Sequence, residues 1–153
     1  LKQNRQIKQV EQYLALFDFS PFFPKKWEKR MNETVEQLKT QQLQVEPWGE
    51  LVKKQNISEE LQDELKHYLL QQSLAYKLDD GRLVHRDAFF NATQQLFRGT
   101  EGSAFTLQQA KEILGLSRKY LIPFLELLDR LKMTVRAGKE RKWVKRTVDK
   151  ALN

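Results

Sequence analysis

Residues 105–138 read FTLQQAKEILGLSRKYLIPFLELLDRLKMTVRAG, and this stretch decides the fold because it holds two helix starts and a turn. The pattern Thr106-Leu107-Gln108-Gln109 matches a capping box, and the helix that it begins is expected to run to Leu114, where Gly115 ends it. Ser117 is the expected N-cap of a second helix. Apolar residues recur along one face of that helix: Leu121, Phe124, Leu125, Leu128 and Leu131.

A hairpin is expected after the second helix. Residues 133–136 and 141–144 are its predicted strands, and the turn between them contains Gly138. Upstream of the capping box, a further helix is expected from Asp87 to about Phe97. Three helices followed by a two-stranded hairpin are typical of a winged helix, which is a helix-turn-helix fold with an appended β-ribbon.

The same order of elements occurs once before in the chain. Helices are expected at residues 33–42, 46–55 and 58–72, and strands at residues 74–78 and 82–86 around the turn Asp79-Asp80-Gly81. The pairs Ile57-Ser58 and Leu116-Ser117 stand 59 residues apart, and each precedes a helix and a hairpin. We therefore predict a mostly α protein with small β-hairpins, built from tandem winged-helix (helix-turn-helix) domains. A small helical bundle is the alternative.

The positive charge of the chain is concentrated at its C-terminal end. The 153 residues carry a formal net charge of +7, and residues 117–153 hold eleven Lys and Arg against four Asp and Glu, so the preceding residues sum to zero. Within this end, Arg130 follows Glu126 by one turn and is expected to pair with it. Clustered cations with interleaved apolar residues are the electrostatic footprint of a phosphate-backbone binder. A solvated basic tail is the alternative.

The two copies differ in charge where their third helix begins. In the first copy this helix carries Glu59, Glu60, Asp63 and Glu64, which would repel phosphates, so this copy is predicted to be a spacer. In the second copy it begins with Ser117-Arg118-Lys119-Tyr120, where two cations join the free N–H groups of a helix N-terminus and an aromatic ring offers a surface for base stacking. The predicted RNA-binding residues, with those of the wing, are Ser117, Arg118, Lys119, Tyr120, Arg136, Lys139, Arg141 and Lys142.

A proline interrupts this helix. Pro123 lacks a backbone N–H, which leaves the carbonyl of Lys119 without its helical hydrogen-bond partner. Readers of duplex DNA usually reach base edges with residues in the middle of a helix. The interruption therefore favours recognition of an RNA backbone and loop.

These observations divide the chain into three parts. Residues 1–31, with a helix expected at 3–17, form a connector or the remnant of a preceding winged helix. Residues 32–86 form the spacer winged helix, and residues 87–153 form the RNA-binding one. The first residue is not Met and already stands in helical register, so we expect the chain to be a piece of a longer protein.

The sequence gives little support to catalysis. The chain has no cysteine, and His67 and His85 lack the spacing of a zinc site. No GxxxxGK[ST] phosphate loop is present. We expect no catalytic residue, no metal and no cofactor in this fragment. The apolar runs are a few residues long and no signal peptide opens the chain, so we also expect no membrane span.

The opening stretch resembles the last winged helix of the bacterial selenocysteine-specific translation elongation factor family, SelB. The shared pattern is an Arg-Lys pair that opens the recognition helix, then Leu-Glu, Asp-Arg, a Thr before the wing and a Gly in the wing turn. The resemblance is tightest over residues 105–141. It is looser over residues 33–104, which are similar to the penultimate winged helix of that family.

The resemblance implies a function. In this family an EF-Tu-like GTPase part carries selenocysteinyl-tRNA, and the C-terminal winged helices bind the mRNA hairpin (SECIS) that recodes a UGA codon. Arg118 and Lys119 match the helix-opening pair, and Arg136 matches a basic residue of the wing. Val135 departs from the pattern, where another Arg is expected, so the wing contact is expected to be rearranged.

The sequence thus predicts a non-enzymatic fragment that tethers a GTP-hydrolysing elongation factor to an mRNA stem-loop during translation. The expected partners are that RNA and, through the full-length factor, the ribosome and selenocysteinyl-tRNA. We expect a cytoplasmic monomer. Two alternatives are a tandem winged-helix DNA-binding regulator, since the fold serves both nucleic acids, and a protein-interaction module that uses the acidic first copy.

Overall fold

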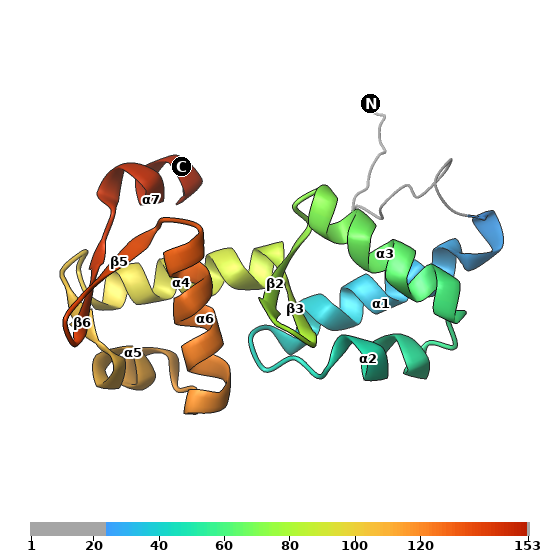
Figure 1. The fold of residues 1–153 in the computed structure, drawn as a ribbon, viewed down its shortest axis with the longest axis horizontal. Coiled ribbons are helices and arrows are strands. Elements are labelled where there is room, and N and C mark those ends of the chain that lie inside the picture. The colour runs from blue at the N-terminus through green and yellow to red at the C-terminus, as the bar shows by residue number, and fades with distance from the viewer. Residues whose placement is uncertain (1–23, 153) are drawn as a thin grey trace.

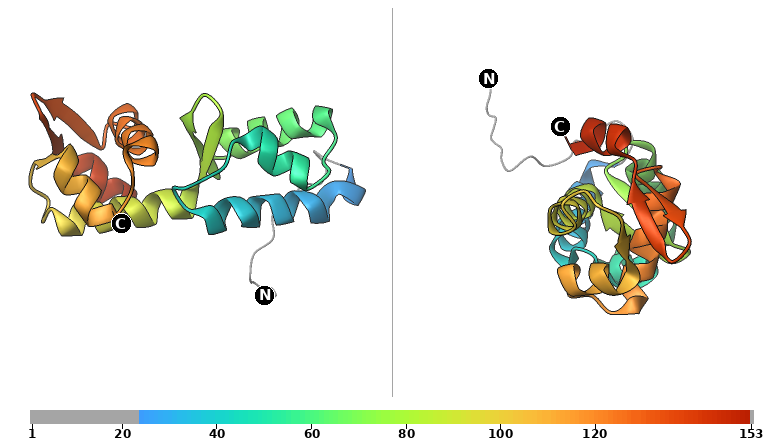
Figure 2. Two further views of the ribbon diagram at one scale, coloured as in Figure 1. Left: turned by 90° about the horizontal axis from the view of Figure 1, so that it is seen from below. Right: turned by 90° about the vertical axis from the view of Figure 1, so that its left-hand side faces the viewer.

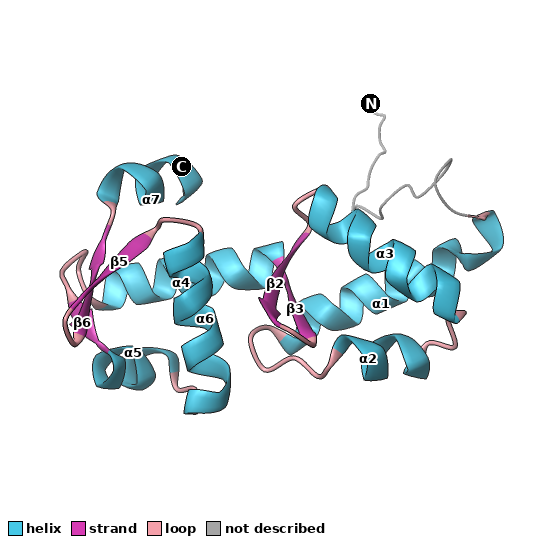
Figure 3. Ribbon diagram, viewed as in Figure 1, coloured by secondary structure: helices cyan, strands magenta, loops and turns pink. Residues whose placement is uncertain are grey.

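The computed structural model describes residues 24–152, which form two similar units along one long axis (Figure 1). The first unit comprises η1 (Lys25–Trp27), α1 (Glu28–Gln41), α2 (Trp48–Lys54), α3 (Glu59–Gln71), β2 (Ala75–Asp79) and β3 (Arg82–His85). The second comprises α4 (Arg86–Gly99), β4 (Phe105–Thr106), α5 (Leu107–Leu114), α6 (Arg118–Arg130), β5 (Thr134–Ala137), β6 (Glu140–Trp143) and α7 (Lys145–Leu152). Helices dominate and the sheets are small and antiparallel, which confirms the predicted fold class (Figure 3).

Helical periodicity builds the core of the first unit. Met31, Val35 and Leu38 recur at intervals of three or four residues along α1, and all three are buried. α3 contributes Leu65 and Leu69 in the same way. The hairpin of β2 and β3 covers this core from one end, and every residue of β3 is buried.

The second unit has a three-stranded sheet in the order β4-β6-β5. Its central strand ends at Trp143, which is buried. The Trp143 indole N–H donates to Oγ1 of Thr100 at 3.0 Å, and its ring lies edge-on to Phe97, with the ring centroids 5.0 Å apart. These contacts satisfy the polar atom of the indole while its apolar body fills the core.

Helix α4 is shared by the two units. The fully buried ring of Phe89 lies 5.1 Å from the ring of Tyr76 in the first unit and 5.7 Å from that of Phe124 in the second. Further along α4, Phe97 packs on Trp143 of the second unit. The predicted division between residues 86 and 87 therefore falls at the start of a helix that both units cover (Figure 1).

The other predicted division also meets a helix. α1 begins at Glu28, before the division at residue 32, and Met31 is fully buried in the first unit. Residues 28–31, which the sequence assigned to the connector, therefore belong to helix α1 of the first unit. The helix expected at residues 3–17 lies outside the described residues.

Besides the short η1, two elements were not predicted. β4 pairs Phe105 with Arg141 of β6, and it is too short to show a strand pattern in the sequence. α7 follows β6 and buries Val148, while Lys145, Arg146 and Lys150 are exposed. A single deeply buried side chain gives little periodicity from which a helix could be recognised.

The helix starts differ in how they are capped. Thr106 and Gln109 form the predicted capping box: the Gln109 N–H donates to Thr106 Oγ1 at 3.2 Å and the Thr106 N–H donates to Gln109 Oε1 at 2.8 Å. Ser58 and Ser117 stand at the N-cap positions of α3 and α6 with extended backbone, but neither side chain caps its helix within the described part of the chain. Gly115 ends α5 in the left-handed conformation, with φ of 65°.

Candidate nucleic-acid interface

The start of α6 gathers positive groups. Ser117, Arg118 and Lys119 are all exposed, and the first turn of α6 contains no acidic residue. The N–H groups of the helix N-terminus add partial positive charge at the same place. In the first unit, α3 begins instead with the exposed Glu59 and Glu60. The two units therefore present opposite charge at equivalent helix starts.

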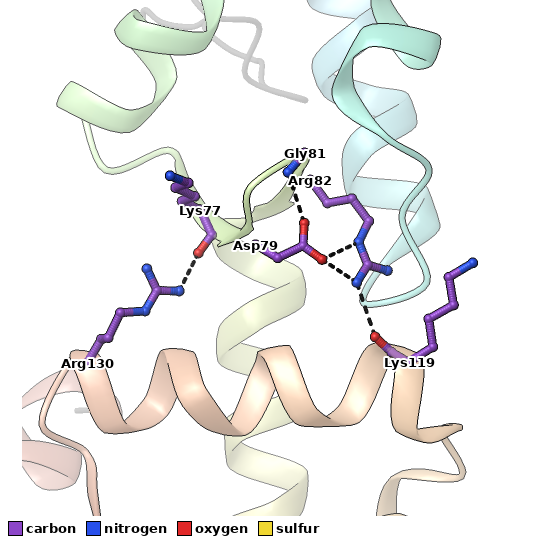
Figure 4. Close-up of polar contacts among 6 residues, drawn as sticks. All are labelled: Lys77, Asp79, Gly81, Arg82, Lys119 and Arg130. Carbon is purple, nitrogen blue, oxygen red and sulfur yellow. Dashed lines mark hydrogen bonds and ion pairs between the residues drawn. The ribbon is translucent and has the colours of Figure 1, made fainter.

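The carbonyl that Pro123 releases receives a donor from the first unit. Nη2 of Arg82, at the start of β3, donates to the carbonyl oxygen of Lys119 at 3.1 Å (Figure 4). This hydrogen bond supplies what the missing N–H of Pro123 would have supplied within α6. The intrahelical hydrogen bond to the Lys119 carbonyl is thus missing as expected, and Arg82 of the first unit replaces it.

Asp79 holds Arg82 in place. The Arg82 side chain is 9% exposed, and its Nε and Nη2 donate to Oδ2 of Asp79 at 2.8 and 2.5 Å. The Gly81 N–H donates to the other carboxylate oxygen at 3.1 Å. The hydrogen bonds from Arg82 hold the pKa of the Asp79 carboxyl below its usual value, with burial opposing them. The carboxylate therefore stays ionised at neutral pH and fixes the direction of the guanidinium.

The Tyr120 ring contacts two cations. The guanidinium carbon of Arg82 lies 5.2 Å from the centroid of this half-buried ring, and Nζ of Lys119 lies 5.4 Å from it. Both distances lie within the range of cation–π interactions. Base stacking by Tyr120 stays a prediction, and in the structure the ring joins α6 to the first unit.

The hairpin of β5 and β6 carries the remaining predicted residues, but it divides them between its two faces. Arg136 lies opposite Arg141 in the strand pairing, and Val135 lies opposite Lys142. Because successive side chains of a strand alternate, Arg141 and Lys142 point to opposite faces. Arg136, Lys139 and Lys142 are exposed, and Val135 is 50% exposed.

Arg141 is paired with an acidic residue of α6. Its Nε donates to the two carboxylate oxygens of Asp129 at 3.1 and 3.2 Å, and its side chain is 11% exposed. The Thr134 hydroxyl donates to Asp129 at 2.5 Å. Asp129 therefore ties both strands of the hairpin to the end of α6. This geometry gives Arg141 a structural task, while its predicted contact with RNA is untested.

Helix α6 and the hairpin of β5 and β6 lie on one side of the second unit, and α4 lies on the other (Figure 2). The turn of the hairpin points toward the outer end of the molecule, whereas the start of α6 is nearer to the first unit (Figure 1). The predicted residues are thus divided between the start of α6 and the two faces of the hairpin.

The histidines occupy ordinary structural positions. His85 is buried, and its Nδ1 accepts from the N–H of Asp87 at 3.0 Å, while His67 is exposed on α3. Burial of the His85 imidazole lowers its pKa. Residues 24–152 contain no group of three or more His, Cys, Asp or Glu that could hold a metal ion. None of the helices in this range is long and apolar enough to cross a bilayer.

Comparison with known proteins finds a family match within the second unit. Residues 97–143 match the family model described as elongation factor SelB, winged helix. The predicted resemblance to the C-terminal winged helices of SelB is therefore confirmed. No curated protein sequence matches the chain.

Two solved structures are similar to this chain. The crystal structure of a bacterial selenocysteine-specific elongation factor, EF-Sec, is 30% identical and covers 79% of this chain and 19% of its own, with a TM-score of 0.61. The mRNA-binding domain of SelB from E. coli, solved in complex with SECIS RNA, is 21% identical and covers 79% of this chain and 98% of its own, with a TM-score of 0.62. This chain thus spans 19% of the length of the first structure, and its likeness to the second concerns the fold.

Proposed function

We propose that this chain binds an mRNA stem-loop of the SECIS type, as the C-terminal part of a selenocysteine-specific elongation factor. The observation that carries this proposal is the start of α6, where Arg118 and Lys119 are exposed and the first turn contains no acidic residue, in a unit whose residues 97–143 match the SelB winged-helix model. The structure of the SelB mRNA-binding domain with SECIS RNA supports it as a relative with the same fold. Binding would hold the factor at a recoded UGA codon during translation.

The chemistry of an RNA stem suits this surface. The major groove of an A-form stem is too deep and narrow for side chains, so a protein recognises the phosphate backbone and a few unstacked loop or bulge bases. Arg118 and Lys119, together with the N–H groups that open α6, offer cations and donors to phosphates. The half-exposed Val135 offers an apolar contact beside Lys142. Affinity should fall steeply as salt is added, because each phosphate contact releases counterions.

Fluorescence anisotropy with a labelled stem-loop RNA tests the proposal. We expect Arg118→Ala and Lys119→Ala each to weaken binding by about 1–3 kcal/mol, because each removes a charged contact. Glu59→Ala and Glu64→Ala are controls at the acidic start of α3, and they should leave the affinity unchanged or slightly higher. Wild-type affinity in both α6 variants would contradict the assignment, and a large loss in the α3 variants would place the site in the first unit.

A competition experiment with duplex DNA separates the proposal from its main alternative. A tandem winged-helix DNA-binding regulator would prefer a duplex, whereas we expect an unlabelled stem-loop RNA to displace the probe at a lower concentration than a DNA duplex of matched length. Both competitors carry a similar number of phosphates, so the comparison removes the nonspecific electrostatic contribution. Stronger competition by the duplex would favour the DNA-binding regulator.

The role of the whole factor is part of the same proposal. We propose that a GTPase part precedes this chain in the full-length protein, and that it reaches the ribosome and selenocysteinyl-tRNA in the cytoplasm. We further propose that the RNA-binding region itself acts as a monomer without a cofactor or a catalytic residue. Recovery of an EF-Tu-like GTPase in the upstream reading frame would support this; a DNA-processing enzyme there would contradict it.

A further inference from the structure

The hairpin of the first unit is docked onto α6 at two points. Arg82 donates to the Lys119 carbonyl near the start of α6, and Nη2 of Arg130 at its end donates to the Lys77 carbonyl of β2 at 2.6 Å (Figure 4). Between these two points, Phe124 of α6 packs against Phe89. The element that would be the wing of the first unit therefore supports the helix that presents Arg118 and Lys119.

Arg82 itself is poorly placed to touch RNA. It is buried, with 8% of the residue exposed, and its Nη1 is buried without a hydrogen-bond partner in the described structure. Removing a guanidinium from water and leaving one of its donors unpaired is costly. The contacts that offset this cost are the carboxylate of Asp79, the ring of Tyr120 and the carbonyl of Lys119. Two of the three lie on the first turn of α6.

We propose that Arg82 is a positioning residue for RNA binding, acting through the Lys119 carbonyl. Pro123 leaves this carbonyl without a hydrogen-bond donor inside α6, and Arg82 supplies the donor. The orientation of the Arg118–Lys119 turn therefore depends on the first unit. The inference rests on the proposed function, because it concerns how the same RNA contacts are placed. It assigns the first unit a task in recognition that does not require that unit to touch the RNA.

Arg82→Met tests the inference in the full chain. Met retains much of the apolar stem of Arg and removes its donors. With the stem-loop RNA as the probe, we expect the affinity to fall about tenfold, and the slope of log K against log salt to fall by about 1, because a phosphate contact is misplaced. A lower folded fraction would reduce the apparent affinity at every salt concentration and leave the slope unchanged. Arg30→Met removes an exposed charge at the far end of the first unit and should change neither quantity.

Two double-variant comparisons locate the effect. In an Arg118→Ala, Lys119→Ala background, Arg82→Met should change the affinity by less than about twofold, since the contacts that it positions are gone. In a Pro123→Ala background, the new N–H can donate to the Lys119 carbonyl within α6, so the loss caused by Arg82→Met should shrink to about threefold or less. Additive losses in either background would overturn the inference, because Arg82 would then contact the RNA itself or act elsewhere.

A measurement without RNA separates this inference from the proposed function. Arg82→Met should shift the ¹⁵N–¹H amide resonances of residues 117–121, and Pro123→Ala added to it should return them toward the wild-type positions. Unshifted resonances would overturn the positioning role whatever the RNA data show. Absence of stem-loop binding by the wild-type protein, with the resonance shifts present, would overturn the proposed function instead.

Discussion

Arg141→Met decides between the structural task of Arg141 and its predicted contact with RNA. The Arg141 guanidinium donates to Asp129 at 3.1 and 3.2 Å, and the two side chains are 11% and 26% exposed. A hydrogen bond to a charged group contributes about 1.5–3 kcal/mol. The value here should lie near the lower end, because Asp129 is partly hydrated and keeps the Thr134 hydroxyl as a donor.

We therefore expect Arg141→Met to lower the free energy of unfolding by about 2 kcal/mol. For a chain of this size, that loss corresponds to a melting temperature lower by about 4–8 °C. Urea and thermal unfolding followed by circular dichroism measure both quantities. Stem-loop affinity, measured well below the melting temperature, should change by less than about threefold.

Lys142→Met is the matched control, because Lys142 is the next residue of β6 and is exposed on the opposite face. It should change the stability by less than about 0.5 kcal/mol. The reasoning would be refuted if Arg141→Met left the stability unchanged and lost as much RNA affinity as Arg118→Ala. In that case the pair with Asp129 would have to open when RNA binds.

Two further predictions concern stability. Burial lowers the pKa of His85 from its usual value of 6.5, so the unfolded chain takes up a proton more readily than the folded one. The urea midpoint should therefore fall as the pH decreases below about 6.5, and His85→Gln should flatten this dependence. An unchanged midpoint between pH 7.5 and 5.5 would contradict the buried neutral imidazole. In Gly49→Ala, the added Cβ in α2 meets no atom within 4 Å, so the free energy of unfolding should rise by about 0.5–1 kcal/mol. Gly115 has φ of 65°, so Gly115→Ala should lower this free energy by about 1 kcal/mol. A shift of the same sign in both variants would refute the backbone argument.

Local patterns accounted for the parts of the fold that depend on neighbouring residues. The apolar spacing in α6 and the capping box at Thr106 concern contacts within a few positions, and the structure confirms both. The resemblance to SelB winged helices also came from one contiguous run of residues. β4 and α7 were missed because the first is two residues long and the second buries one side chain deeply.

Contacts between distant residues were beyond such patterns. Pro123 indicated that the Lys119 carbonyl needs a donor, but Arg82 is 37 positions away and reaches it once the two units have packed. Arg130 was expected to pair with Glu126 on the same helix, and it donates instead to Lys77, 53 positions away. An exposed surface pair contributes little, so the tertiary hydrogen bond prevails.

Charge counting could not separate the basic residues of the hairpin. Arg141 and Lys142 are adjacent in the sequence and were assigned to the same surface. The strand alternation sends one toward Asp129 and the other to solvent, and the partner on α6 stands 12 positions away. Alternation read together with the acidic residues of the preceding helix would have been the signal to use.

The helix shared by the two units, α4, has a mechanical consequence. Its 14 residues span about 21 Å as a continuous rod, with Phe89 gripped from both sides. If the second unit binds an mRNA stem-loop as proposed, a force applied through that RNA would be transmitted along α4 to the first unit. The two units should therefore move together as one rigid body. Cleavage of the chain before α4 would remove Tyr76 from the ring of Phe89 and expose that ring.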